Sequence, residues 1–238
     1  KDVGFDVFSL ANNHIFNWGR LAFEDTLGQI SQNNLKYAGG GFSGPEAYLG
    51  ADFKVSGVKI IVLGFSEFMA GGINSTSTKS GIATISEDNV RDFVSAARLN
   101  NDLVIVSFHF GEEYQKFPND YQTKYAHLAV DFGADLVVGH HQHVVQTLEQ
   151  YKNSYIIYSL GNFIFDQYWR DDLEDGYMVR MSYNEQSFLY DLVPVHSVRS
   201  VPSLAEGKDK ERILSSIARQ SLASLQSSIV GGRIVVPR

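Results

Sequence analysis

Two histidines separated by one residue, His141 and His143, form the arrangement in this sequence that is best suited to bind a metal ion. Gly139 precedes them, and a turn at this glycine would let both side chains reach one site. Neutral imidazole is a common ligand of zinc, iron and manganese. The alternative is that His140, His141 and His143 simply form a polar surface turn.

Two further clusters of polar side chains are candidates for the same site. His109 is another candidate ligand, and Glu112 follows it closely enough to orient its ring or to approach the metal ion or substrate. In Asn12-Asn13-His14, an amide oxygen could bind metal and the imidazole could donate a proton or stabilise an oxyanion. The alternatives are a hydrogen-bonded, partly buried His109, a solvated Glu112 and an ordinary polar turn at Asn12-Asn13-His14.

All three clusters follow predicted strands. The runs Phe5–Ala11, Leu103–Phe108 and Asp135–Val138 each lead directly into one of them. In α/β proteins the carboxyl ends of the strands lie along one edge of the sheet, where ligands bind. We therefore expect the three clusters to converge at one edge of an α/β fold.

Hydrophobic periodicity and turn residues predict the other elements. Glycines at 39–41 predict a turn, and Met69–Lys79 predicts a surface loop. The predicted helices are Leu21–Gln32, a helix capped by Ser86 that runs to about Asn100, Asp120–Phe132 and Lys208–Ser228. The predicted strand pairs are Ala51–Ser56 with Val58–Phe65 around Gly57, Val144–Tyr151 with Tyr155–Leu160, and Gly176–Tyr183 with Ser187–Val195. Because we find no repeat or clear linker, we expect one domain over residues 1–238.

The composition narrows the classes of function. Hydrophobic residues make up 44% of the 238 residues, enough to bury a large core. A net charge of −7 and the lack of a basic run argue against a nucleic-acid partner. Without cysteine, a metal site must use His, Asp, Asn or Glu. No apolar run reaches 18 residues, the length expected of a membrane-spanning helix. The chain enters an apolar strand at once without Met, so we expect it to be part of a larger protein.

Four motifs carry a resemblance to a known family, and their order and spacing match over roughly positions 4 to 200. They are SLANNHIFNWG at Ser9–Gly19, FHFGEEY at Phe108–Tyr114, DFGADLVVGHHQHVV at Asp131–Val145 and YSLGNFIFD at Tyr158–Asp166. Together they resemble the bacterial poly-γ-glutamate capsule biosynthesis family, called CapA or PgsA. That family is similar to calcineurin-like metallophosphoesterases, so the resemblance implies a layered β-sandwich flanked by helices. It also implies that this chain lacks the first strand of the fold.

The resemblance also implies roles for individual residues. Asn13, His109, His141 and His143 would bind divalent metal ions (Mn, Zn or Fe), and His14 would be the catalytic histidine. In the phosphoesterase mechanism, two metal ions polarise the phosphoryl group and generate a hydroxide nucleophile, while the histidine assists the leaving group. His140 occupies a position that the family leaves variable. Within the last motif, Asn162 would shape the pocket wall and Asp166 could hydrogen-bond a ligand histidine, with an ordinary turn carboxylate as the alternative for Asp166.

Two departures from the family pattern concern carboxylates. The family has aspartate where this chain has Asn17, and the early Gly-Asp strand and nearby Glu of the family do not precede Phe5. Three histidines and one amide suffice for one metal ion but hold two dications poorly. Either the acidic residues lie outside this sequence or the chain carries an incomplete site.

We therefore expect a capsule-biosynthesis protein that acts in the synthesis, transfer or processing of an anionic surface polymer. Its expected partners are that polymer or a phosphoryl substrate, together with other membrane proteins of capsule synthesis. The expected location is extracytoplasmic, with attachment through a segment outside this sequence, and a cytoplasmic location is the alternative. The rival functions are a non-catalytic accessory or polymer-binding protein of the same fold and a general metal-dependent phosphoesterase.

Overall fold

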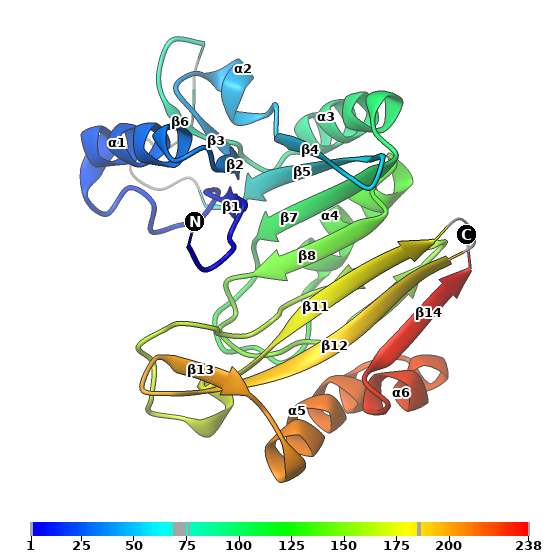
Figure 1. The fold of residues 1–238 in the computed structure, drawn as a ribbon. Helices are drawn as coiled ribbons and strands as arrows, with labels where there is room; N and C mark the ends of the chain where they lie inside the picture. The colour runs from blue at the N-terminus through cyan, green and yellow to red at the C-terminus, as the bar shows by residue number, and fades with distance from the viewer. Residues whose placement is uncertain (1, 69–74, 76, 185–186, 238) are drawn as a thin grey trace. The chain divides into compact units, whose positions relative to one another are not determined.

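The structure, a computed structural model, describes residues 2–68, 75, 77–184 and 187–237. The described residues group into two compact units. Unit 1 comprises the residues up to Phe110 together with Thr123–Val138, and unit 2 comprises Gly111–Gln122 and the residues from Gly139 onward. Strands and helices alternate along much of unit 1, and unit 2 combines a run of strands with helices near the end of the chain, which confirms the predicted α/β class (Figure 1). The expectation of a single domain stays a prediction.

Unit 1 contains a sheet with the strand order β4-β5-β7-β8, a parallel pair β1-β2 and a short antiparallel pair β3-β6. Two of its elements, α4 and β8, have a few residues in unit 2. The elements are β1 (Val7–Ser9), α1 (Gly19–Gln32), β2 (Lys36–Ala38), β3 (Gly40–Gly41), α2 (Gly44–Ala47), β4 (Ala51–Val55), β5 (Val58–Ser66), β6 (Gly81–Ile82), α3 (Glu87–Asn100), β7 (Leu103–His109), α4 (Asp120–Asp131) and β8 (Leu136–His140).

The strands β5 and β7 are the long parallel pair of unit 1, and they lie side by side in Figure 1. Both read as nearly continuous apolar runs because a parallel strand is covered on both faces. Phe65 and Phe108, which are almost completely buried, are paired across the two strands with ring centroids 5.7 Å apart. The register also pairs Ser66 with His109, so His109 is the last residue of a firmly packed strand.

The helices of unit 1 form largely where the sequence predicts them. On α1, Phe23 and Leu27 are fully buried in a cluster with Leu10 and Ile82. The hydroxyl of Ser86 accepts a hydrogen bond of 3.1 Å from the N–H of Asn89, which confirms the predicted cap of α3.

The start of the chain differs from the prediction. The predicted buried strand Phe5–Ala11 is wrong in extent, since β1 covers only Val7–Ser9 and Phe5 is 46% exposed. Burial begins after the strand, at Leu10 and Ala11, because Leu10 packs into the cluster beneath α1. The predicted glycine turn is confirmed at Gly39, which has a φ of +77°, while the next two glycines form β3.

Unit 2 contains a sheet in which β12 pairs antiparallel with β11, β13 and β14, and a hairpin formed by β9 and β10. Its other elements are β9 (Leu148–Tyr151), β10 (Ser154–Ile157), the 3₁₀ helix η2 (Asp171–Leu173), β11 (Asp175–Asn184), β12 (Ser187–Val198), β13 (Val201–Leu204), α5 (Gly207–Gln220), α6 (Ala223–Val230) and β14 (Arg233–Pro237).

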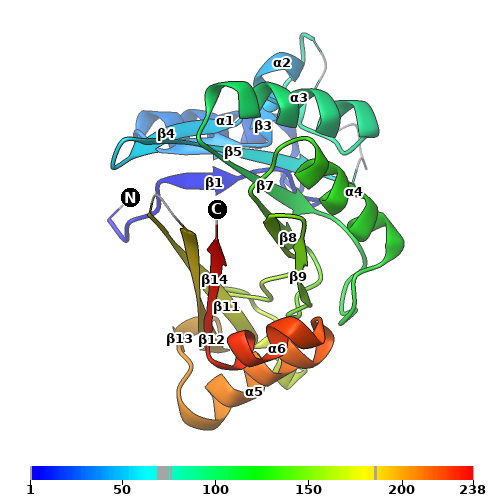
Figure 2. The same ribbon diagram turned by 90° about the vertical axis from the view of Figure 1, so that its right-hand side faces the viewer.

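The long strand β12 organises this unit, because β11 pairs with all of it except its last two residues, and β14 and β13 pair with its beginning and its end. Its buried side chains alternate, with Phe188, Tyr190 and Leu192 facing inward. Figure 2 shows α5 and α6 beside β11, β12 and β14, and the buried residues of α5 include Ile213 and Ile217.

The predicted single helix Lys208–Ser228 is wrong, because the chain breaks at Ser221 into α5 and α6. Ser221 has an extended backbone (φ −95°, ψ 164°). Its hydroxyl accepts a hydrogen bond of 3.0 Å from the N–H of Leu148 and donates one of 2.9 Å to the carbonyl of Ile217. This contact with the start of β9 fixes the end of α5.

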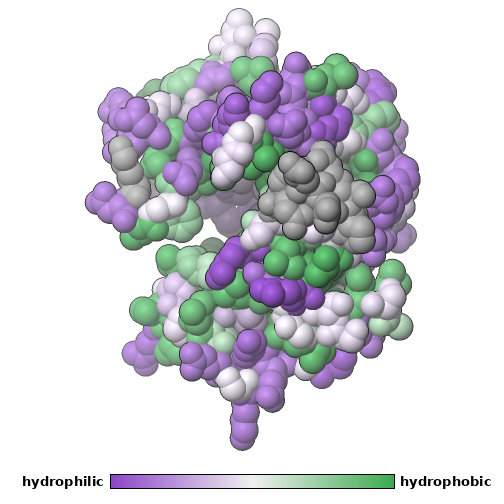
Figure 3. All heavy atoms as spheres, turned by 45° about the vertical axis from the view of Figure 1, so that its right-hand side comes forward, coloured by the Kyte–Doolittle hydropathy of each residue, from purple (hydrophilic) through white to green (hydrophobic). Residues whose placement is uncertain are grey.

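Most of the predicted loop Met69–Lys79 lies outside the described residues. In the part of the chain that the structure describes, no helix combines the length and the apolar character needed to cross a bilayer. The face shown in Figure 3 carries hydrophilic residues with smaller hydrophobic areas among them, as is ordinary for a protein surface.

Replacing the cap residue tests the account of α3. We expect Ser86→Ala to lower the free energy of unfolding by about 1 kcal/mol, because the N–H of Asn89 loses its partner. Ser43→Ala is the matched control, since Ser43 precedes α2 without a capping hydrogen bond and should change stability by less than about 0.5 kcal/mol. Urea denaturation measures both, and equal losses in the two variants would contradict the assignment.

Candidate metal and phosphoryl site

Unit 1 brings together two of the predicted ligands, Asn13 and His109. The Nε2 atom of His109 lies 2.9 Å from the amide oxygen of Asn13. The strands before them approach as well, because the hydroxyl of Ser107 on β7 donates a hydrogen bond of 3.2 Å to that of Ser9 on β1. The predicted meeting of these two strand ends is therefore present, although β1 pairs with β2 and not with β7.

The spacing of these two atoms suits a hydrogen bond and also a shared metal ion. Two ligand atoms about 2.1 Å from an ion, in neighbouring octahedral positions, are themselves about 3 Å apart. The donor chemistry also fits, because imidazole nitrogen and amide oxygen are both ligands of divalent ions. Asn13 and His109 are each only partly exposed, which limits competition from water.

The loop after Asn13 holds His14 in a defined orientation. The amide oxygen of Asn12 accepts a hydrogen bond of 2.9 Å from the N–H of His14. The side-chain nitrogen of Asn17 lies 3.1 Å from Nδ1 of His14. Because an amide nitrogen only donates, Nδ1 is the acceptor, and neutral His14 carries its proton on Nε2. The ring is exposed, so this proton is available to a bound substrate.

The histidine loop of unit 2 has a strained backbone. His141 and His143 have φ values of 112° and 61°, a region that residues other than glycine rarely adopt. The predicted turn at Gly139 is wrong, because this glycine lies inside β8 and the chain turns at the two histidines themselves. The N–H of Tyr114 donates a hydrogen bond of 2.8 Å to the carbonyl of Gln142 and helps to hold this conformation. Strain of this kind is concentrated at functional sites.

Asn162 fixes the proton of His143. The side-chain nitrogen of Asn162 donates a hydrogen bond of 2.9 Å to the carbonyl of Leu173, so its oxygen faces His143. That oxygen lies 2.8 Å from Nδ1 of His143. Because an amide oxygen only accepts, Nδ1 carries the proton and Nε2 keeps its lone pair. His143 is thus held in the form that binds a metal ion or accepts a proton through Nε2.

The residue before Asn162 explains how this amide reaches its position. Gly161 has a φ of +72°, and a Cβ atom there would lie 2.5 Å from the carbonyl oxygen of Asp175. Any other residue would therefore push the chain away from Asp175. The sequence indicated that Asn162 shapes a wall, but its bond to His143 is found only in the structure.

Aromatic rings complete the surroundings of His143. The ring of Phe165 has its centroid 4.5 Å from that of His143, and the ring of Tyr114 lies 6.1 Å away. The guanidinium of Arg170 lies over the ring of Tyr114, and Gln167 donates a hydrogen bond of 3.1 Å to its hydroxyl. Burial and the Glu113 carboxylate raise the pKa of Tyr114, so the phenol stays protonated. Tyr114 is a site residue that the sequence analysis missed, because its role depends on contacts distant in sequence.

The remaining predicted residues have less specific surroundings. His140 ends β8, and burial lowers its pKa to about 4, so it is neutral near pH 7. Glu112 is exposed and lies in unit 2. Asp166 is exposed too, and within the described residues Asn162, not Asp166, is hydrogen-bonded to a ligand candidate. Taken over the residues that the structure describes, no group of three or more His, Asp or Glu side chains is placed to hold a metal ion.

Most of the chain matches the model of one protein family. Residues 1–167 match the model described as "Bacterial capsule synthesis protein PGA_cap". The chain belongs to this family. The resemblance carried by the four motifs is thereby confirmed, and every predicted site residue lies inside the matched segment, whereas β11–β14 and α5–α6 follow it.

Named members of the capsule synthesis family are similar over most of this chain. The "PGA biosynthesis protein CapA" of Bacillus subtilis (strain 168) is 33% identical over 225 residues, which are 93% of this chain and 59% of that protein. The "Capsule biosynthesis protein CapA" of Bacillus anthracis is 32% identical, over 93% of this chain and 55% of that protein. The "Probable polyglutamine synthesis accessory protein MT0602" of Mycobacterium tuberculosis is 27% identical over 67% of this chain and 45% of that protein. The chain thus spans little more than half the length of its Bacillus relatives.

Solved structures of similar fold include two with enzyme names. The calcineurin-like phosphoesterase YfkN from Bacillus subtilis has a TM-score of 0.48 and 13% identity, covering 96% of this chain and 72% of that one. The NAD nucleotidase NadN of Haemophilus influenzae has a TM-score of 0.49 and 10% identity, covering 96% of this chain and 44% of that one.

The proton position on His143 is directly measurable. We expect the ¹⁵N spectrum of the neutral ring to show a protonated Nδ1 and an unprotonated Nε2, because Asn162 accepts from Nδ1. Asn162→Asp keeps the acceptor and should keep this tautomer, whereas Asn162→Ala should produce a mixture. A neutral wild-type ring protonated on Nε2 would contradict the hydrogen-bond assignment.

Proposed function

We propose that this chain acts in the synthesis, transfer or processing of poly-γ-glutamate or a related anionic surface polymer. Membership of the capsule synthesis family is the observation that carries the proposal. The proposal extends to an extracytoplasmic location and to other membrane proteins of capsule synthesis as partners. The names of the two Bacillus relatives support the pathway.

The chemistry that we propose is metal-assisted hydrolysis or transfer at a phosphoryl or amide centre. Asn13 and His109 are the proposed ligands in unit 1, and His141 and His143 are those in unit 2. A bound Mn, Zn or Fe ion would supply Lewis-acid polarisation of the substrate oxygen.

The proposed roles of the side chains follow from their hydrogen bonds. Asn162 keeps Nε2 of His143 unprotonated and ready to bind. His14, protonated on Nε2, donates that proton to a leaving oxygen or stabilises its charge. The rings of Phe165 and Tyr114 limit the motion of His143 and keep its orientation.

The second candidate is a non-catalytic accessory protein. The donor set favours it, because Asn13, His109, His141 and His143 are all neutral ligands and Asn17 replaces a carboxylate of the family pattern. An accessory protein would use the same site to bind polymer or metal without turnover.

Metal content tests the ligands. We expect His109→Ala and His143→Ala each to lower the bound Mn or Zn at least severalfold after dialysis, because each removes a nitrogen ligand. His127→Ala, on α4, is the matched histidine control and should keep the wild-type content. Elemental analysis gives the metal per chain, and unchanged content in His109→Ala and His143→Ala would sink the assignment.

Turnover and polymer yield separate the two candidate functions. With Mn or Zn, an enzyme should hydrolyse an aryl phosphodiester, and His14→Ala should reduce kcat by about 10²–10⁴-fold. In a host that makes polymer only when this protein is supplied, His143→Ala should abolish the polymer and His127→Ala should not. Polymer loss without turnover of either a phosphodiester or a γ-glutamyl amide under any metal supports the accessory role. Full polymer yield from His143→Ala would overturn both candidates.

A further inference from the structure

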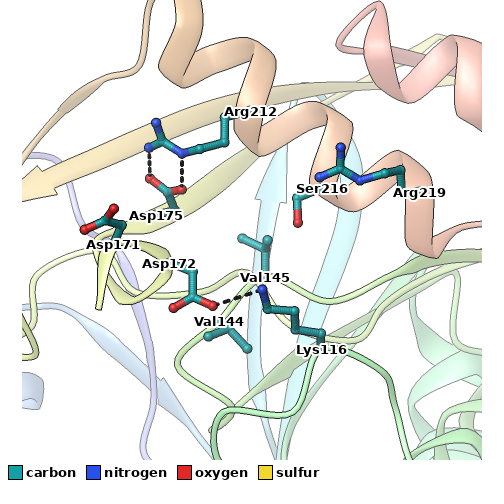
Figure 4. Close-up of a pocket in the computed structure, with 9 residues that line it drawn as sticks. All are labelled: Lys116, Val144, Val145, Asp171, Asp172, Asp175, Arg212, Ser216 and Arg219. Carbon is teal, nitrogen blue, oxygen red and sulfur yellow. Dashed lines mark hydrogen bonds and ion pairs between the residues drawn. The ribbon is translucent and has the colours of Figure 1, made fainter. Parts of the chain in front are cut away.

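Unit 2 contains a cavity of about 250 Å³ whose wall includes none of the histidines of the histidine loop (Figure 4). Basic, acidic and apolar side chains all contribute to its wall. They are Lys116, Val144, Val145, Asp171, Asp172, Asp175, Arg212, Ser216 and Arg219.

Two of the acidic side chains are already neutralised by protein cations. The guanidinium of Arg212 donates two hydrogen bonds, of 3.0 and 2.7 Å, to the buried carboxylate of Asp175. Arg170 donates two more, of 2.6 and 2.9 Å, to Asp172, and Lys116 lies 3.2 Å from the same carboxylate. These contacts lower the pKa of Asp172, with the bond from Arg170 as the main cause. Asp172 therefore stays charged, and both acids are paired with protein cations.

Two opposite charges in the wall stay open to a ligand. Across the described residues, neither the Arg219 guanidinium nor the Asp171 carboxylate has an ion pair or hydrogen bond. Figure 4 shows Arg219 beside Ser216 at one side of the cavity and Asp171 near Asp175 at the other. Ser216 and Arg219 are three residues apart on α5, so they share one face of the helix.

The wall between these two sides carries two valines together with the ion pair of Lys116 and Asp172. Val144 and Val145 lie between the two sides in Figure 4 and are almost completely buried, with 1% and 6% of their surfaces exposed. A ligand in the cavity therefore meets a hydrogen-bond donor and a cation at one side, and the valine methyl groups beside a paired lysine and aspartate in the middle. At the other side it meets the carboxylate of Asp171.

We propose that this cavity binds the amino-terminal end of a γ-linked glutamate chain, a group that carries an ammonium, methylenes and carboxylates. The ammonium pairs with Asp171, the methylenes lie against Val144 and Val145, and a carboxylate accepts hydrogen bonds from Arg219 and Ser216. The identity of the polymer rests on the proposed function, whereas the charge pattern is a property of the cavity itself.

The charge pattern selects this end over other anions. A carboxylate or phosphate without an ammonium would satisfy Arg219 and leave Asp171 facing a like charge. The volume also favours the end of a chain over a longer segment. At about 250 Å³ the cavity is smaller than the about 300–1,000 Å³ that is typical of sites for drug-sized ligands.

Calorimetric titration of the purified chain with γ-glutamylglutamate tests the site. We expect Arg219→Gln and Asp171→Asn each to raise Kd about tenfold or more, because each removes one charge-assisted contact. Lys210→Gln and Glu211→Gln are matched controls on α5 outside the cavity wall, and their Kd should stay within about twofold of wild type.

Three further ligands distinguish the sources of binding. N-acetyl-γ-glutamylglutamate should bind wild type about tenfold more weakly, and Asp171→Asn should bind the free and acetylated dipeptides alike. Free glutamate and inorganic phosphate should both bind more weakly than the dipeptide. Each of four results would overturn the proposal. They are equal Kd values for glutamate and the dipeptide, equal Kd values for the free and acetylated dipeptides in wild type, an unchanged Kd in Arg219→Gln, and no binding of the dipeptide at millimolar concentration. Loss of polymer in His143→Ala together with any of these results would leave the proposed function standing and reject this cavity alone.

Discussion

The buried amide of Asn162 joins three parts of unit 2 that are far apart in the sequence. Its oxygen accepts from His143 in the histidine loop, and its nitrogen donates to the carbonyl of Leu173 in η2. A buried amide with both ends paired has one orientation, because reversing it would leave two polar groups unsatisfied. The same η2 carries Asp171 and Asp172 of the cavity wall. The proton position on His143 and the position of that wall therefore depend on one side chain.

In unit 1, the pairing of strands positions the candidate ligand His109. The apolar runs of β5 and β7 are buried as a parallel pair, and this pairing ends at His109. The imidazole then stands where the packed strand stops and the backbone becomes free to turn. Asn13 reaches it from a short strand outside the main sheet, with Ser9 and Ser107 hydrogen-bonded behind them. Packing thus sets the position of the histidine, and polar contacts set its partner.

The sequence predicts correctly the features that depend on neighbouring residues, and it fails where a feature depends on contacts between residues far apart in the sequence. The strand pair around Gly57, the cap at Ser86 and the long strand before His109 depend on local patterns and are confirmed. The break at Ser221 depends on a hydrogen bond to Leu148, 73 residues away, and no local signal marks it.

The site shows the same division between local and long-range signals. Residue type and order indicated the histidines, but the turn was assigned to Gly139 because glycine is the residue that adopts a positive φ most easily. The structure instead places that strain on His141 and His143. The cavity was not predictable at all, because Lys116, Asp171 and Arg219 are brought together only by the tertiary fold.

Two side-chain amides, presenting opposite ends to their histidines, give two neutral histidines different hydrogen-bonding roles. Asn17 donates to Nδ1 of His14, which leaves the proton on Nε2, whereas Asn162 accepts from Nδ1 of His143, which leaves Nε2 with its lone pair. A carboxylate at position 17 could only accept, so it would place the proton of His14 on Nδ1 and remove Nε2–H as a donor in the neutral ring. The asparagine at position 17 therefore sets the tautomer of His14 as well as its orientation. It makes Nε2 of His14 a hydrogen-bond donor without protonating the ring, while Nε2 of His143 stays an acceptor, so the two histidines have opposite hydrogen-bonding roles.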